Sequence, residues 1–182
     1  MARSPSSAIL LVDGYNIVGA WPELVSLKAE KGYEAARQQL TEDLANYSAF
    51  KGFETWLVFD AYAQPTASSQ EAVTPQLSVH YTHFGQTADS YIERACAQFR
   101  HDSRKFRQRL IVATSDRVHR QTVIGYGAEW MSATQLQREL MLAMGRVRRR
   151  QKSSKGRAGR LLGSLDPEAQ SRLRQLRMGL PD

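Results

Sequence analysis

The sequence of 182 residues contains one cysteine and no long apolar run. The single thiol of Cys96 excludes an internal disulfide and a thiolate-rich zinc site, and its place in a helical stretch predicts a buried structural role. No apolar stretch approaches the ~18 residues of a membrane span. The first residues also lack the apolar core and the cleavage site of a signal peptide. We therefore expect a cytoplasmic protein that does not enter the membrane.

The four histidines also lack any spacing that is typical of a metal site. His80, His83, His101 and His119 form no His-Glu-x-x-His pattern, and none has a cysteine partner in the sequence. An isolated histidine without such a spacing is more often an ordinary residue than a metal ligand. We expect all four to be surface or partly buried side chains without a metal role.

Positive charge, in contrast, is abundant in one segment. The net charge is +7, and residues 146–160 hold eight lysines and arginines and no acid, so the rest of the chain carries about −1. The segment could be a solvated, flexible linker. A dense block of one sign repels itself unless it meets an anion, which favours an arm that binds phosphates. The candidate RNA-binding residues are Arg146, Arg148, Arg149, Arg150, Lys152 and Lys155.

Strand and helix patterns alternate along the chain. Short apolar runs predict strands at residues 8–13, 55–60, 77–82, 109–115 and 128–132. Helical spacing predicts helices at residues 33–50, 88–99, 116–124, 133–150 and 166–177, and residues 63–76 are expected to form a polar loop. This alternation predicts an α/β fold with a mainly parallel central sheet flanked by helices. We expect a domain of residues 1–150 and a basic tail of residues 151–182.

Acidic residues stand where several predicted strands end. Asp13, Asp60 and Asp116 each follow an apolar run, and Asp89 lies in the first turn of the helix after the third strand. Parallel strands present their carboxyl ends at one edge of the sheet, where ligands bind in open α/β folds. Four carboxylates at one edge repel one another unless a proton or a cation intervenes. A hard divalent cation, Mg²⁺ or Mn²⁺, suits these oxygen ligands.

These residues predict a metal-dependent nuclease. Asp13, Asp89 and Asp116 are the expected metal ligands, and Asp60 and Asn16 are expected to orient a ligand or a water molecule. A bound divalent ion can activate water and stabilise the charge that develops on a phosphodiester. The basic segment gives a reason for the substrate to be a nucleic acid.

Each candidate also has a structural alternative. Asp89 can favour the positive end of its helix, Asp60 and Asp116 can cap turns, and Asn16 can stabilise a loop. Glu93 lies one helical turn after Asp89 and is either a further acid of the site or a partner of a nearby arginine.

Three neighbours of these acids have two interpretations as well. Ser115 offers a hydroxyl at the same edge but can equally cap a helix. Tyr15 and Trp21 could stack on RNA bases, although local packing is the stronger expectation because stacking residues need a basic groove around them.

Five stretches of the sequence resemble one known family. They are "LLVDGYNIVGAWPEL", "WLVFDAY", "QTADSYIERA", "IVATSD" and "IGYGAEWMSATQLQREL". Their residue identities, order and spacing resemble those of the YacP-like NYN-domain proteins, a branch of the PIN-like nucleases. The resemblance covers residues 8 to about 150. The resemblance implies a PIN-like three-layer fold and metal-dependent endoribonuclease activity. It also places Asp13, Asn16, Asp89 and Asp116 in the acidic active site, with Asp60 close by.

The resemblance further implies an RNA substrate, mRNA in a ribosome-linked setting, with Mg²⁺ or Mn²⁺ as the cofactor. A second hypothesis comes from a different class: a non-catalytic module that keeps the fold and binds RNA or the ribosome through its basic arm. Both hypotheses allow binding through the arm, so RNA cleavage is the observation that separates them.

Overall fold

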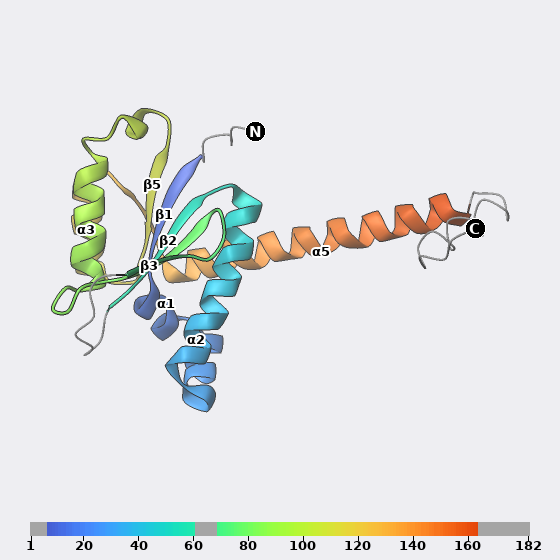
Figure 1. The fold of residues 1–182 in the computed structure, drawn as a ribbon, viewed down its shortest axis with the longest axis horizontal. Helices are drawn as coiled ribbons and strands as arrows, with labels where there is room; N and C mark the ends of the chain where they lie inside the picture. The colour runs from blue at the N-terminus through green and yellow to red at the C-terminus, as the bar shows by residue number, and fades with distance from the viewer. Residues whose placement is uncertain (1–6, 61–68, 164–182) are drawn as a thin grey trace. The chain divides into compact units, whose positions relative to one another are not determined.

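Six strands form one mostly parallel sheet in a computed structural model that describes residues 7–60 and 69–163 (Figure 1). The strand order is β3-β4-β2-β1-β5-β6, and only the pairing of β3 with β4 is antiparallel. The predicted α/β fold with a mainly parallel sheet is confirmed. The strands are β1 (Ala8–Asp13), β2 (Glu54–Phe59), β3 (Ser69–Ala72), β4 (Leu77–Tyr81), β5 (Arg109–Ala113) and β6 (Glu129–Met131).

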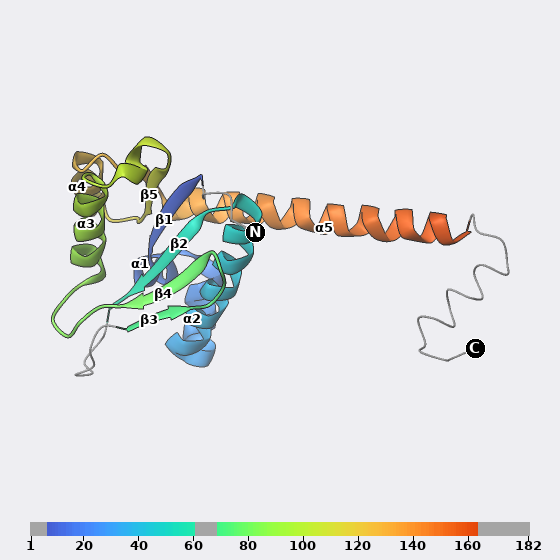
Figure 2. The same cartoon turned by 45° about the horizontal axis from the view of Figure 1, so that its top comes forward.

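Helices cover both faces of this sheet (Figure 2). The helices α3 (Ala88–Phe99) and α4 (Arg117–Gly125) lie on one face. The other face is covered by α1 (Gly14–Ala20), α2 (Pro22–Lys51) and the beginning of α5 (Ala133–Gly163). Every residue of β1 is buried, because helices cover both faces of the strand, and this explains the unbroken apolar run that precedes Asp13.

The path of the chain makes the end of β1 a topological switch point. From β1 the chain passes through α1 and α2 to β2 on one side, and from β4 it returns through α3 to β5 on the other side. Connections that diverge on opposite faces leave a crevice at the carboxyl ends of the two central strands, and ligands of open α/β sheets bind there. Asp13, the last residue of β1, lies at this point.

The elements differ from the sequence prediction in three places. The helix expected at 33–50 is the part of α2 that follows a break at the non-helical Gly32, so this prediction holds. The helical residues before the break, in α1 and in the first part of α2, were not predicted, because glycine, asparagine and proline obscured the helical pattern there. Part of the expected loop at residues 63–76 forms β3, whose four residues are all exposed and therefore show no apolar alternation. The helix expected to end near residue 150 continues to Gly163.

The chain divides into two compact units, Met1–Ala143 and Met144–Asp182. The residues of α5 that belong to the first unit bury Ala133, Leu136 and Leu140 in its core, and the later residues of the helix belong to the second unit. The helix expected at residues 166–177 lies outside the described residues. None of the helices in the described part of the chain has the length and apolarity of a membrane span.

Candidate metal centre at the carboxyl edge of the sheet

The central residue of the site is Asp13, which is only 8% exposed. Its backbone is extended and its carboxylate caps α1, because Oδ1 accepts a hydrogen bond of 3.1 Å from the backbone N–H of Asn16. Burial, together with the nearby carboxylates of Asp89 and Asp60, raises the pKa of Asp13 to about 7, against the lowering effect of the Asn16 hydrogen bond. A carboxyl group in this state gains from a cation that replaces its proton.

The second carboxylate, Asp89, is brought to Asp13 by the first turn of α3. Thr87 caps this helix as expected, with its side chain accepting a hydrogen bond from the Ser90 N–H. Asp60, which directly follows β2, accepts a further hydrogen bond from the Ala88 N–H. Asp60 thereby fixes the beginning of α3 to the neighbouring strand and holds Asp89 in place. Burial also raises the pKa of Asp60, opposed by the Ala88 hydrogen bond.

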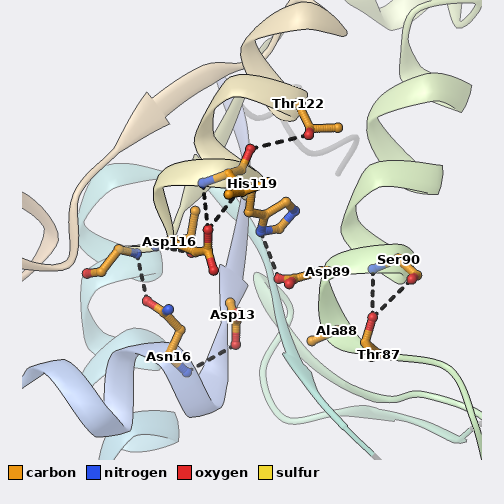
Figure 3. Close-up of polar contacts among 12 residues, drawn as sticks. Asp13, Asn16, Thr87, Ala88, Asp89, Ser90, Asp116, His119 and Thr122 are labelled. Carbon is orange, nitrogen blue, oxygen red and sulfur yellow. Dashed lines mark hydrogen bonds and ion pairs between the residues drawn. The ribbon is translucent and has the colours of Figure 1, made fainter.

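A histidine completes the group. The ring of His119, on α4, is buried, and its Nδ1 lies 2.9 Å from Oδ1 of Asp89 (Figure 3). Apart from this contact with Asp89, neither ring nitrogen has a hydrogen-bond partner among the described residues. A buried ring nitrogen without a hydrogen bond is costly, and a bond to a metal ion would give it a partner.

Asp13, Asp89 and His119 can each offer one ligand atom, and these atoms lie within 4.8 Å of one another. Two carboxylates and one imidazole suit a divalent transition ion, and oxygen-rich sites of this kind also take Mg²⁺. A cation would offset the burial and the like-charge repulsion that raise the pKa of Asp13, and it would give a partner to the His119 ring. On these two grounds the residues present fit a divalent metal.

The remaining predicted residues at this edge make other contacts. Asp116 is exposed and caps α4, and hydrogen bonds from the backbone of His119 and Val118 hold its pKa below the usual range. The side-chain oxygen of Asn16 accepts a hydrogen bond of 2.6 Å from the Ser115 N–H. Asn16 therefore joins the loop after β5 to the beginning of α1, as Figure 3 shows. Both residues lie beside the three-residue group and hold its framework in place.

Other candidates lie farther from the group of three. Glu93 is half-buried on α3 and does not belong to it. Arg146 and Arg149 are exposed on α5, whereas the side chains of Arg148, Arg150, Lys152 and Lys155 lie outside the description. The expected packing of Trp21 is confirmed: it is 3% exposed and donates from Nε1 to the Ala133 carbonyl at 2.9 Å. Cys96 is buried, as expected.

His119 is the residue that sequence reasoning missed. We expected an ordinary histidine, but His119 follows the strand-end residue Asp116 by three positions and so lies in the first turn of α4. This turn begins at the same edge as Asp13 and Asp89, and residues three apart on a helix share a face. The spacing Asp-x-x-His after a predicted buried strand was the available signal.

Comparison with known proteins identifies the family of the chain. The family described as YacP-like NYN domain matches residues 10–178. The chain belongs to the YacP-like NYN domain family. A Bacillus subtilis (strain 168) relative, the uncharacterized protein YacP, is 35% identical over 142 residues, which are 78% of this chain and 80% of that protein.

Two crystal structures of Bacillus subtilis Rae1 (YacP) share the fold. One, of a mutant, has a TM-score of 0.68 and 30% identity over 92% of this chain and 99% of that chain. The other has a TM-score of 0.67 and 34% identity over 94% of this chain and 95% of that chain. A YacP-like NYN domain indicates a nuclease-type hydrolase with a function related to RNA.

Proposed function

We propose that this protein is a metal-dependent endoribonuclease that hydrolyses phosphodiester bonds of single-stranded RNA. The observation that carries the proposal is the group of Asp13, Asp89 and His119 at the switch point of a YacP-like NYN domain. When bound there, Mg²⁺ or Mn²⁺ would supply an activated water and charge stabilisation for attack on a phosphodiester.

Each residue of the site has its own role in this proposal. Asp13 and Asp89 hold the cation, and the buried ring of His119 contributes the third ligand. Asp60 positions Asp89 through the Ala88 N–H, and Asn16 ties the Ser115 loop to the helix that Asp13 caps. Asp116, at the exposed edge, is placed to orient water or an RNA hydroxyl and to add a ligand to the site.

The direct test is cleavage of end-labelled RNA with Mn²⁺ or Mg²⁺ and with EDTA. Internal cuts that need the metal support the proposal, and intact RNA under all conditions, including in the presence of translating ribosomes, contradicts it. Ribosomes belong in the test because we extend the proposal to mRNA in a ribosome-linked, cytoplasmic setting, on the strength of the family resemblance. A non-catalytic RNA- or ribosome-binding module predicts binding in these assays without cleavage.

His119→Gln should weaken the binding of Mn²⁺ by about 10- to 100-fold, because one ligand is lost while the two carboxylates remain. Titration of metal-free protein with Mn²⁺, followed by electron paramagnetic resonance of the free ion, measures this affinity without reference to activity. His101→Gln is the control, since His101 is exposed in the turn after α3 and should leave the affinity unchanged. Equal affinities of the two variants would remove His119 from the ligand set.

The basic arm gives a separate prediction. If the arm binds phosphates, replacing Arg148, Arg149 and Arg150 by Gln should reduce the slope of log affinity against log salt concentration by about 2, at ~0.7 per contact on single strands. Fluorescence anisotropy of labelled RNA over a salt series measures the slope. The matched control replaces three arginines near the amino ends of the strands by Gln: Arg100, Arg104 and Arg107. An unchanged slope in the arm variant would make the arm a linker only.

A further inference from the structure

A row of aromatic rings leads from the metal centre to the surface of α2. Tyr15, two residues after Asp13, packs edge to face against Phe59 at 5.1 Å and against Tyr33 at 5.6 Å, measured between ring centroids. Phe59 precedes Asp60 and is 1% exposed, whereas Tyr33 is 54% exposed. The row therefore begins at the carboxyl edge, between two of the acids, and ends on a ring that solvent reaches.

The backbone at Gly32 sets the direction of this last ring. Gly32 has φ 86° and ψ 174°, inside the span of α2, and these values are almost confined to glycine. On a continuous helix, residues five apart do not face each other. The break at Gly32 lets Nζ of Lys28 lie 5.0 Å from the centroid of the Tyr33 ring. The Tyr33 ring is exposed and has a cation over one face, a combination that is typical of platforms on which nucleobases stack.

A second cation lies along the row. Nη1 of Arg37 donates to the Tyr15 hydroxyl at 3.4 Å, and its guanidinium lies 6.0 Å from the centroid of the Phe59 ring. Another nitrogen of the same group pairs with the exposed Glu34. The Nε atom is buried and has no hydrogen-bond partner among the described residues. The guanidinium thus lies against Tyr15 and Phe59. Each of its two Nη atoms uses one N–H in these contacts and keeps one for a phosphate.

We propose that Tyr33, Lys28 and Arg37 form a binding site for an unpaired nucleotide of the RNA strand, outside the cleavage centre. Tyr33 stacks on the base, and Lys28 neutralises the charge of the neighbouring phosphate. Arg37 contacts the RNA backbone between this nucleotide and the cleaved bond. This inference rests on the proposed function for its substrate, and it adds a requirement: the strand must have an unstacked base at one fixed distance from the cleaved bond.

The inference accounts for features that local packing leaves unexplained. Packing accounts for Tyr15 and Phe59, which are partly or fully buried, but not for an exposed tyrosine that directly follows the helix break at Gly32 and has a lysine over its ring. Base stacking is tolerant of sequence because every base has a π-face, so the site would select single strands rather than a particular sequence. Paired bases are already stacked and would not reach the ring.

The test measures binding of fluorescently labelled oligouridylate to the full chain in EDTA, where metal-dependent cleavage does not occur. Tyr33→Ala should weaken binding by about 10-fold or more, and Tyr33→Phe should bind as the unmodified protein does, because only the ring is needed. Phe106→Ala is a matched control, since Phe106 is 81% exposed and has Nζ of Lys105 at 5.1 Å, but precedes β5 at the other edge of the sheet.

A second arm uses oligouridylates with one abasic position moved stepwise along the strand. One position should weaken binding of the unmodified protein and have no effect on Tyr33→Ala. Equal affinity of Tyr33→Ala and Phe106→Ala, or no binding of oligouridylate by the unmodified protein, would overturn the inference. Ring-dependent binding without cleavage in Mn²⁺ or Mg²⁺ would support this site while contradicting the nuclease. RNA cleavage by Tyr33→Ala with an unchanged KM would support the nuclease while contradicting this site.

Discussion

Asp13→Asn should lower metal-dependent RNA cleavage by at least about 100-fold, because the metal loses a charged ligand at the centre of the site. The same change should stabilise the metal-free protein above pH 7. An asparagine oxygen can still accept the Asn16 N–H and cap α1, so the local fold is retained. A loss of activity together with a gain of stability separates a functional carboxylate from a structural one.

The sign of the stability change follows from the pKa. Asp13 has a pKa of about 7 in the folded protein and an ordinary value of 3.8. The folded state therefore holds the proton more tightly, and this contribution to stability is complete below pH 3.8 and is lost as the pH rises through 7. Asparagine has no such loss, so we expect a gain of about 1–3 kcal/mol at pH 8 and little change at pH 4.

Urea unfolding in EDTA at pH 4 and pH 8 measures this difference, and the cleavage assay with Mn²⁺ measures the activity. Asp102→Asn is the control. Asp102 also caps a helical turn, Ser103–Phe106, but it lies near the amino ends of the strands. Hydrogen bonds from Arg104 lower its pKa. That variant should cleave RNA normally and should not gain stability at pH 8. Full cleavage by Asp13→Asn would exclude Asp13 from the metal site.

The sequence predicted the sheet well because its strands are buried on both faces. Runs such as residues 8–12 are apolar without alternation, and such runs arise only where helices cover both sides. The edge strand β3 was missed for the opposite reason, since four exposed residues leave no apolar signal. Helix α3 could be predicted to its ends because Thr87 is a good cap.

The sequence predicted the location of the site at the carboxyl ends of the strands, but not its detailed geometry. Strand ends show which carboxylates share an edge, but the sequence does not show which of them turn toward one another. Asp116 and Asp60 use their oxygens on backbone N–H groups, whereas Asp89 meets His119 from another helix. The contact between residues 89 and 119 depends on the packing of α3 beside α4. The spacing of residues in the sequence does not predict how two helices pack. Tyr33 was overlooked because the helix before Gly32, which brings Lys28 to its ring, was not predicted.

Gly14→Ala should destabilise the protein by about 1–3 kcal/mol, because a methyl group at this position would enter the ring of Phe59. Of the three ring atoms that an added Cβ would meet first, even the farthest would be only 2.8 Å away. The ring cannot move aside easily, since it is buried and packs against Tyr15 and Tyr81. Gly14 is therefore a site of close approach between α1 and β2, directly between Asp13 and Asp60.

Gly19→Ala is the matched control for this prediction. Gly19 lies on the same helix, is exposed, and a Cβ there would meet nothing within 4 Å. Its replacement should leave stability unchanged or raise it by up to about 1 kcal/mol through helix propensity. Thermal unfolding of both variants, with RNA cleavage measured in parallel, gives the comparison. Because a displaced Phe59 moves the backbone of Asp60, which anchors α3, Gly14→Ala should also lose cleavage activity. If the two alanine variants were equally stable and equally active, the contact between Gly14 and Phe59 would have no part in holding the two acids together.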